Sequence, residues 1–222
     1  GIGITEKVGK ELFTYVDVLS SGNHIWDKKE GIEYMDKEPR LLRPANYPDI
    51  NPGQGSYIFE SGTGEKIGVL NLQGRVFMEA IDCPFRTADR MVESLKKNTP
   101  IIVVDFHAEA TSEKQALGWF LDGRVSAVIG THTHIPTADE RILPKGTAYI
   151  TDAGMVGGSD SVIGIRRSQA VQRFLTSCPQ RFEPSKKGAV LTAVYLEVDS
   201  KTGKALLIQR ENIIEASSGF SE

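Results

Sequence analysis

The chain contains four histidines, and two of them, His132 and His134, lie in the segment Gly-Thr-His-Thr-His at residues 130–134. This segment follows an apolar run at residues 125–129 that predicts a buried strand. Residues i and i+2 of an extended segment point to the same side, so we expect both imidazoles to face one spot, with Thr133 turned away. Such a pair is a suitable metal chelate. The alternative is a pair of surface histidines in a loop.

The other two histidines occupy equivalent positions. His24 follows a strand predicted over residues 16–19, and His107 follows one predicted over residues 101–106. Ligand sites in α/β proteins usually lie at strand ends, so we expect the four imidazoles to converge on one pocket. Asn23 adds a neutral oxygen donor beside His24, and because neighbouring residues point in different directions the two are expected to have different roles. Imidazole suits zinc, iron, manganese or nickel.

An alternating series of strands and helices must position these side chains. Apolar periodicity predicts a mixed α/β domain whose later part is mainly antiparallel strand. The predicted helices are 5–15, 26–37, 84–97, 111–121 with Thr111 as the cap, and 168–177. The predicted strands are 16–19, 41–42, 57–60, 67–72, 101–106 and 125–129, with hairpins at 141–150 and 189–210 and loops at 44–55 and 154–164.

The composition is that of an ordinary soluble globular protein. Of 222 residues, 40% are hydrophobic and 25% charged, and the formal net charge is -3. No basic stripe is present, which argues against binding of duplex nucleic acid but allows a small anionic substrate if a metal supplies positive charge. No apolar run approaches the length of a membrane span. Cys83 and Cys178 lie far apart and are predicted to be reduced thiols in a cytoplasmic protein.

Several short motifs together resemble a known enzyme family. Gly22-Asn23-His24, Phe106-His107 and the 130–134 segment resemble the later motifs of calcineurin-like metallophosphoesterases, GNH, a lone His and GHxH. The wider segments 22–30, 43–46, 72–75 and 105–114 resemble the YmdB-like family of bacterial phosphodiesterases. GNH alone is a weak signal, whereas the ordered set is specific and the similarity covers almost the whole chain.

The resemblance implies a fold and a site. The fold would be a four-layer αββα sandwich with two metal ions, iron or manganese, between the sheets. By this resemblance Asn23, His107 and His132 would hold one metal and His134 the other, while His24 would protonate the leaving oxygen of the ester. Two cations about 3.5–4 Å apart polarise phosphoryl oxygens and generate a bridging hydroxide, which attacks in line.

The sequence departs from the family pattern near His24. An acidic residue often follows GNH directly in the wider superfamily, whereas here Ile25 and Trp26 intervene before Asp27. Asp27 orients His24 on one interpretation. On the other it is a carboxylate at a helix N-terminus, where the helix dipole favours negative charge.

The second departure concerns the first metal ligands. The family begins with a strand that carries an aspartate ligand, and a second strand ends in Gly-Glu-Asn, whose glutamate bridges the metals; this sequence contains neither. We therefore expect residues 1–222 to form a single metallophosphoesterase domain that lacks its first strand-helix-strand unit, with donors for one ion rather than two. Asp105 and Glu109 are candidates for the missing carboxylate, the alternative being hydrogen-bonded structural acids.

The leading functional hypothesis is a metal-dependent phosphodiesterase that hydrolyses 2′,3′-cyclic nucleotides at the 2′-oxygen. One alternative is a phosphomonoesterase with the same site. The other is a non-catalytic metal-binding or interaction module, because the first ligands are absent, and we expect at most weak activity from residues 1–222 alone. The expected partner is a small phosphodiester such as a cyclic nucleotide, and a homo-oligomer is compatible with the sequence. Weaker candidates for phosphate or base contacts are Arg43, Asn46, Arg75 and Arg124.

Overall fold

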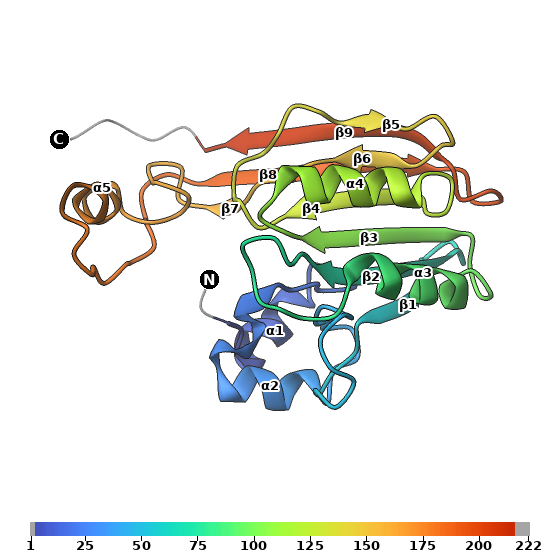
Figure 1. Cartoon of the computed structure of the whole chain (residues 1–222), viewed down its shortest axis with the longest axis horizontal. Helices are drawn as coiled ribbons and strands as arrows, with labels where there is room; N and C mark the ends of the chain where they lie inside the picture. Colours follow the sequence, from blue (N-terminus) through green and yellow to red (C-terminus); the bar gives the residue numbers. More distant parts are fainter. Residues whose placement is uncertain (1–2, 216–222) are drawn as a thin grey trace.

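Two β-sheets form the centre of the computed structural model, which describes residues 3–215 (Figure 1). The larger sheet has the order β1-β2-β3-β4-β6-β5 and the smaller the order β7-β8-β9. The strands are β1 (Ser56–Glu60), β2 (Lys66–Gln73), β3 (Ile101–His107), β4 (Ala127–Thr131), β5 (Arg141–Ile142), β6 (Ala148–Ile150), β7 (Val156–Gly157), β8 (Val190–Val198) and β9 (Ala205–Ile214). The helices are α1 (Glu6–Leu12), the 3-10 helix η1 (Asn23–Asp27), α2 (Lys29–Met35), α3 (Pro84–Leu95), α4 (Thr111–Leu121) and α5 (Arg167–Thr176).

The middle strands of the larger sheet run parallel. β2, β3, β4 and β6 pair in parallel, whereas β1 and β5 are antiparallel strands at the two edges. In this register Gln73 lies opposite His107, and His107 lies opposite Thr131. The carboxyl ends of three strands therefore meet at one edge of the sheet, on the side where α5 projects (Figure 1).

Each face of the larger sheet packs against a different layer. Alternate residues of β3 point to opposite faces, so Val104 and Phe106 join the core under α3 and α4, whereas Val103 faces the smaller sheet. Ala127 and Ala148 contact Leu196 and Ile208 of β8 and β9 there, and the small alanines allow the two sheets to approach closely. The core under the helices contains Leu70, Leu72, Ala88, Val92, Leu117, Leu121, Val128 and Tyr149.

The mixed α/β fold with two packed sheets is confirmed. Within residues 3–215 the layers are helix, sheet and sheet, and the outer face of the smaller sheet carries exposed apolar side chains, including Tyr195 and Leu206. α1, η1 and α2 do not cover a face of the larger sheet; with residues 19–41 they form a separate small core of Ile25, Tyr34, Met35 and Leu41, next to β1 and β2. No helix in this described range is long and apolar enough to cross a membrane.

Most predicted elements are present, but several differ in detail. The predicted strands at 16–19 and 41–42 make only isolated bridges, Leu19 to Leu41 and Leu42 to Gln54, because no strand of the described chain pairs along their length. The predicted helix 26–37 is divided into η1 and α2, since Lys28 between them is extended. Thr111 is not a cap: Ala110 occupies the cap position without a side-chain hydrogen bond. β4 begins and ends two residues later than predicted, and the short strand β7 lies within the predicted 154–164 loop.

A pair of leucines in strands tests this assignment of the core. Leu70 is fully buried in β2, whereas Leu206 in β9 is 62% exposed. We expect Leu70→Ala to lower the free energy of unfolding by about 2–5 kcal/mol, because it removes buried methyl groups and leaves a cavity. Leu206→Ala should change it by less than about 0.5 kcal/mol. Equal losses in urea denaturation of the two variants would contradict the described packing.

Candidate metal centre

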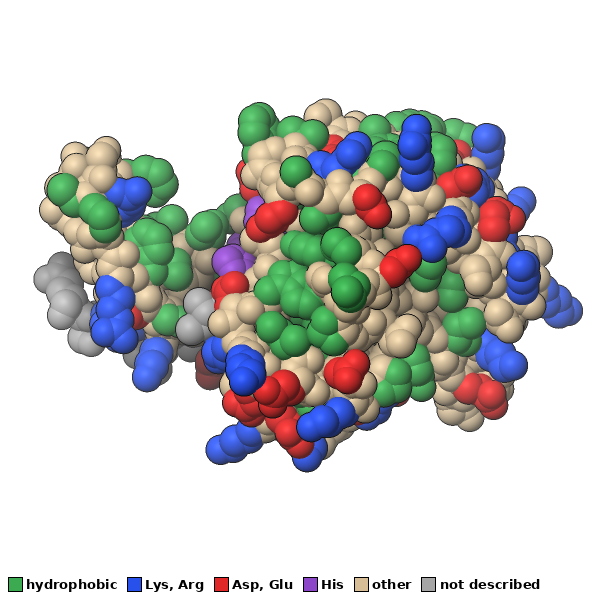
Figure 2. Space-filling view, turned by 60° about the horizontal axis from the view of Figure 1, so that its bottom comes forward, with side chains coloured by type: hydrophobic (Ala, Val, Ile, Leu, Met, Phe, Trp, Pro, Cys, Tyr) green, Lys and Arg blue, Asp and Glu red, His purple; other side chains and the backbone are tan. Residues whose placement is uncertain are grey.

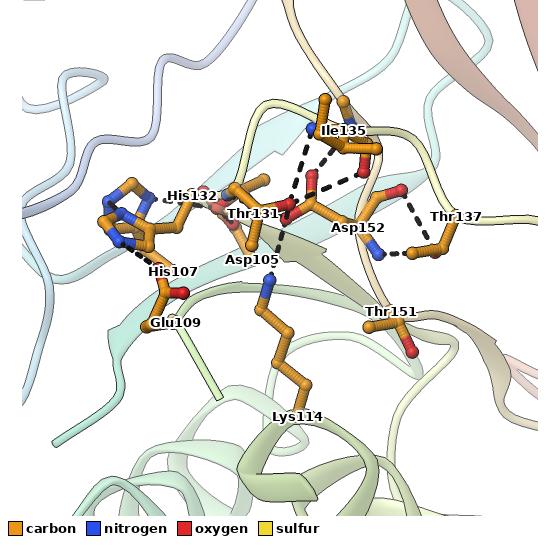
Figure 3. A network of polar contacts seen from close by, with 12 residues as sticks. Asp105, His107, Glu109, Lys114, Thr131, His132, Ile135, Thr137, Thr151 and Asp152 are labelled. Atoms are coloured by element: carbon orange, nitrogen blue, oxygen red, sulfur yellow. Dashed lines mark hydrogen bonds and ion pairs between the residues drawn. The ribbon is translucent and has the colours of Figure 1, made fainter. Parts of the chain in front are cut away.

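Three donor atoms from distant parts of the chain meet at the carboxyl ends of β3 and β4. His107 Nε2 lies 3.0 Å from His132 Nδ1 and 3.1 Å from Asn23 Oδ1. Figure 3 shows His107 and His132 side by side. Ligands bound at right angles to one cation, each at ~2.1 Å, would lie about 3 Å apart. The observed spacing therefore fits a shared metal ion.

The orientation of the His107 ring is fixed from behind by Thr131 and Asp105. Burial raises the pKa of Asp105 to about 6, so at neutral pH this carboxyl group is mainly ionised and can only accept hydrogen bonds. The Thr131 hydroxyl therefore donates to Asp105 Oδ1 at 2.8 Å and accepts from His107 Nδ1 at 3.1 Å. Burial also lowers the pKa of His107 to about 3, so the ring is neutral and Nε2 carries its lone pair.

His132 is held in a similar way by a carboxylate on its outer side. Its Nε2 lies 3.1 Å from Glu109 Oε2, and burial lowers the pKa of His132, which favours a neutral ring with one N–H. If Nε2 carries the proton and donates to Glu109, the lone pairs of His132 Nδ1 and His107 Nε2 face each other and repel. If Nδ1 carries the proton and donates to His107, the lone pair of His132 Nε2 faces the Glu109 carboxylate and is repelled by it. A cation bound between the two rings removes the repulsion in the first arrangement, so the donor chemistry fits a metal ion.

His134 is held by a segment outside this cluster. Its Nδ1 lies 2.9 Å from the Ile163 carbonyl oxygen, which can only accept, so Nδ1 carries the proton and Nε2 is free to bind a metal. The prediction that the backbone stays extended through His132 and His134 is wrong, so the alternation of side chains does not determine where these two imidazoles point. Both have positive φ, 107° and 67°, because the backbone leaves the extended conformation after Thr131.

A buried ion pair holds the loop between these two histidines. Lys114 Nζ lies 2.7 Å from Asp152 Oδ2, and both side chains are almost completely buried. Asp152 also accepts hydrogen bonds from the Thr133 N–H at 3.0 Å and the Thr133 hydroxyl at 2.8 Å (Figure 3). Thr133 is thus turned away from the donors, as predicted. The ion pair itself was not predicted from the sequence, although an aspartate just after β6 was a usable signal.

Asp27 orients His24. His24 Nδ1 lies 2.8 Å from Asp27 Oδ2, which leaves Nε2 free on a ring that is 58% exposed. Asp27 is the last residue of η1 and directly precedes Lys28, the N-cap of α2, so it also lies beside a helix N-terminus, as the alternative interpretation expected. Gly22 lies against the His107 ring, and a Cβ at that position would overlap it. The GNH motif therefore supplies close packing, a donor atom and an oriented imidazole in three successive residues.

Neither candidate carboxylate replaces a ligand directly. Both oxygens of Asp105 are engaged, one by Thr131 and the other by Asn71 Nδ2 at 3.2 Å, and Glu109 contacts only the far nitrogen of His132. Across residues 3–215, no three or more His, Cys, Asp or Glu side chains are grouped to hold a metal ion. The cluster reaches three donors only through the amide of Asn23.

The weaker candidates have mostly structural contacts. Arg43 is buried and donates to loop carbonyls, and Asn46 bonds to the backbone of Gln73 and Asp82. Arg124 lies before β4, at the opposite edge of the sheet, and pairs with Asp89 and Glu93. The Arg75 backbone N–H donates to Glu113, next to the carboxyl end of β2.

Comparisons with known proteins find similar sequences and similar folds. A family model described as YmdB-like protein matches residues 1–211. The chain is 49% identical over 211 residues to the 2′,3′-cyclic-nucleotide 2′-phosphodiesterase of Bacillus subtilis, covering 95% of this chain and 80% of that protein. A hypothetical protein from Thermus thermophilus has a TM-score of 0.90 at 41% identity, covering 97% and 83% of the two chains. A structure described as a novel phosphatase of Mycoplasma pneumoniae has a TM-score of 0.89 at 38% identity, covering 97% and 79%.

The contact between Gly22 and His107 can be tested by metal titration. Gly22→Ala should displace the His107 ring and weaken Mn²⁺ binding roughly 10–100-fold, as measured by isothermal calorimetry. Gly62→Ala is the matched control, because a Cβ there meets no atom within 4 Å. Unchanged Mn²⁺ affinity in Gly22→Ala would contradict the assignment of His107 as a donor.

Loss of the buried lysine should unfold the protein more readily. Lys114→Met leaves the Asp152 carboxylate buried without its counter-charge, so we expect the free energy of unfolding to fall by about 3–5 kcal/mol. The matched variant Lys96→Met removes a surface pair with Glu93 and should cost about 1 kcal/mol or less. Chemical denaturation compares the two, and similar small losses would show that the buried pair does not hold this region together.

Proposed function

The chain belongs to the YmdB-like protein family, and on that basis we propose that it is a metal-dependent phosphodiesterase of 2′,3′-cyclic nucleotides. Its relatives are named as a phosphodiesterase and a phosphatase, so the family activity is hydrolysis of phosphoesters. The observation that carries the proposal is the convergence of His107 Nε2, His132 Nδ1 and Asn23 Oδ1 within 3.0–3.1 Å. Such a donor cluster at strand ends is suited to a cation that binds a phosphate.

We propose that these three residues hold one metal, iron or manganese, and that His134 Nε2 contributes to a second. In support, the other ring nitrogens of His107, His132 and His134 lie within hydrogen-bonding distance of oxygen atoms. This is the arrangement usual for metal-bound histidines. When bound, a metal pair would polarise the phosphoryl oxygens and activate the attacking water.

His24 is proposed as the acid that protonates the leaving group. Attack of water on the phosphorus of a 2′,3′-cyclic phosphate breaks the bond to the 2′-oxygen, which then needs a proton. With Nδ1 held by Asp27, a protonated His24 donates from Nε2 to the 2′-oxygen, and the product is a 3′-phosphate. Asp27 stabilises the protonated ring and fixes its orientation.

A phosphomonoesterase with the same site is the second candidate, because one relative is described as a phosphatase. Release of phosphate from mono- and diesters by the same preparation separates the two activities. A non-catalytic metal-binding module would bind Mn²⁺ without turnover of either substrate. We also propose a reducing, cytoplasmic location, which the free thiols of Cys83 and Cys178 support.

The acid role of His24 gives a direct test. We expect His24→Gln to lower kcat on 2′,3′-cyclic AMP with Mn²⁺ by roughly 10²–10⁴-fold, because the leaving oxygen loses its proton donor. Mn²⁺ binding should persist in this variant, whereas His107→Ala should lose it. Full activity in His24→Gln would remove His24 from the mechanism, and absence of turnover by the unaltered protein would favour the non-catalytic alternative.

A further inference from the structure

A small lobe stands beside the candidate metal centre. Residues 158–188, here called the α5 lobe, contain α5 and project beyond the carboxyl ends of β2, β3 and β4 (Figure 1). The lobe contacts the site through His134, whose Nδ1 donates to the Ile163 carbonyl at 2.9 Å. The next carbonyl, that of Gly164, accepts from the Ser185 N–H at 2.8 Å. Two hydrogen-bonded contacts therefore connect the metal centre to the segment that precedes Lys186.

The α5 lobe is strongly basic within an acidic chain. It contains six lysines and arginines but two acidic residues, whereas the whole chain has a net charge of -3. Arg166 pairs with Glu183 and Arg167 with Asp160, each at 2.8 Å. The other four cations form no ion pair with any carboxylate between residues 3 and 215; they are Arg173, Arg181, Lys186 and Lys187. Positive charge is thus concentrated next to a centre proposed to bind phosphate.

The α5 lobe also carries two exposed aromatic side chains. Phe174 is 81% exposed and Phe182 is 49% exposed, and neither belongs to a core cluster, so both rings are available for stacking. Figure 2 shows histidine side chains in the hollow between the main body and the α5 lobe. The lobe itself carries both basic and hydrophobic side chains. Cations that follow a phosphate backbone, together with aromatic rings on which bases stack, are the combination used for single-stranded nucleic acid.

We propose that the α5 lobe binds the single-stranded RNA that precedes a terminal 2′,3′-cyclic phosphate and presents this terminus to the metal centre. The proposal rests on the proposed function and names a larger substrate for the same site. Water adds to the terminal phosphorus, the bond to the 2′-oxygen breaks, that oxygen takes a proton, and the RNA is left with a 3′-phosphate. A single strand fits because its bases are free to stack on Phe174 and Phe182, whereas paired bases are not.

The test compares two substrates that carry the same reacting group. One is an oligouridylate of about ten nucleotides ending in a 2′,3′-cyclic phosphate, and the other is 2′,3′-cyclic UMP. We expect the unaltered protein to have the higher kcat/KM on the oligomer. The triple variant Arg181→Gln/Lys186→Gln/Lys187→Gln removes three cations of the lobe. It should lower the ratio of kcat/KM on the oligomer to kcat/KM on cyclic UMP roughly tenfold, because three contacts to the RNA backbone are lost.

The control variant neutralises three lysines elsewhere. Lys145, Lys201 and Lys204 line an open cavity with Thr99 and Gly123, at the amino ends of β3 and β4 and thus opposite the metal centre. Lys145→Gln/Lys201→Gln/Lys204→Gln makes the same change in net charge and should keep the substrate ratio of the unaltered protein. An equal fall in both triple variants would indicate a general effect of charge and overturn the proposal.

Binding provides a readout that does not depend on turnover. A fluorescent form of the oligomer should bind the metal-free protein, as followed by anisotropy, with an affinity that falls as salt is raised. Phe174→Ala/Phe182→Ala should weaken this binding without any change of charge. No binding by the unaltered protein, or equal binding of a duplex of the same length, would overturn the proposal. If cyclic UMP is hydrolysed but the substrate ratio is the same in the lobe variant, this inference fails while the proposed function stands; if neither substrate is hydrolysed, the proposed function fails first.

Discussion

The ion pair between Lys114 and Asp152 is the constraint on which the geometry of the site depends. Taking two charges out of water is costly, and the pair is tolerated because Asp152 also accepts hydrogen bonds from Thr133 and from the Gly154 N–H. Thr133 lies between two histidines in the left-handed region, a conformation that costs free energy and persists only where the surroundings impose it. By fixing Thr133, the buried Asp152 carboxylate sets the positions of the histidines on either side, so that His132 contacts His107 and His134 contacts Ile163 of the α5 lobe.

Carboxylates surround this centre but contact only the outer sides of the imidazoles. Asp27 contacts Nδ1 of His24, Glu109 contacts Nε2 of His132, and Asp105 acts on His107 through the Thr131 hydroxyl. For His107 and His132 the acid favours a proton on the outer nitrogen and so makes the inner nitrogen a better electron-pair donor to a metal, whereas for His24 the Asp27 carboxylate stabilises the protonated ring. The carboxylates therefore orient the imidazole rings, while the candidate metal donors themselves are imidazole and amide groups.

The location of the candidate site could be predicted from the sequence because apolar periodicity indicates where strands end. The parallel strands β2, β3 and β4 bring their carboxyl ends together in any such sheet, so His107 and His132 were expected to meet. The directions of His132 and His134 could not be predicted, because side-chain alternation holds only for an extended backbone and both residues have positive φ. The partnership of Lys114 with Asp152 joins residues that are 38 positions apart; the place of Asp152 just after β6 marks it as a strand-end acid, but no local pattern identifies its partner. Helical periodicity likewise does not reveal that Lys28 is extended and divides η1 from α2.

The alternation along β3 has a consequence for how this sequence can change. Phe106 packs beneath the helices, while its neighbour His107 faces the opposite way, toward Asn23. Inserting or deleting one residue within the strand would exchange these two faces, putting an imidazole into hydrocarbon and a phenyl ring among the polar donors. We therefore expect changes of length to be tolerated in the connections, such as the turn at residues 61–64, where added residues leave the order of inward and outward side chains unchanged.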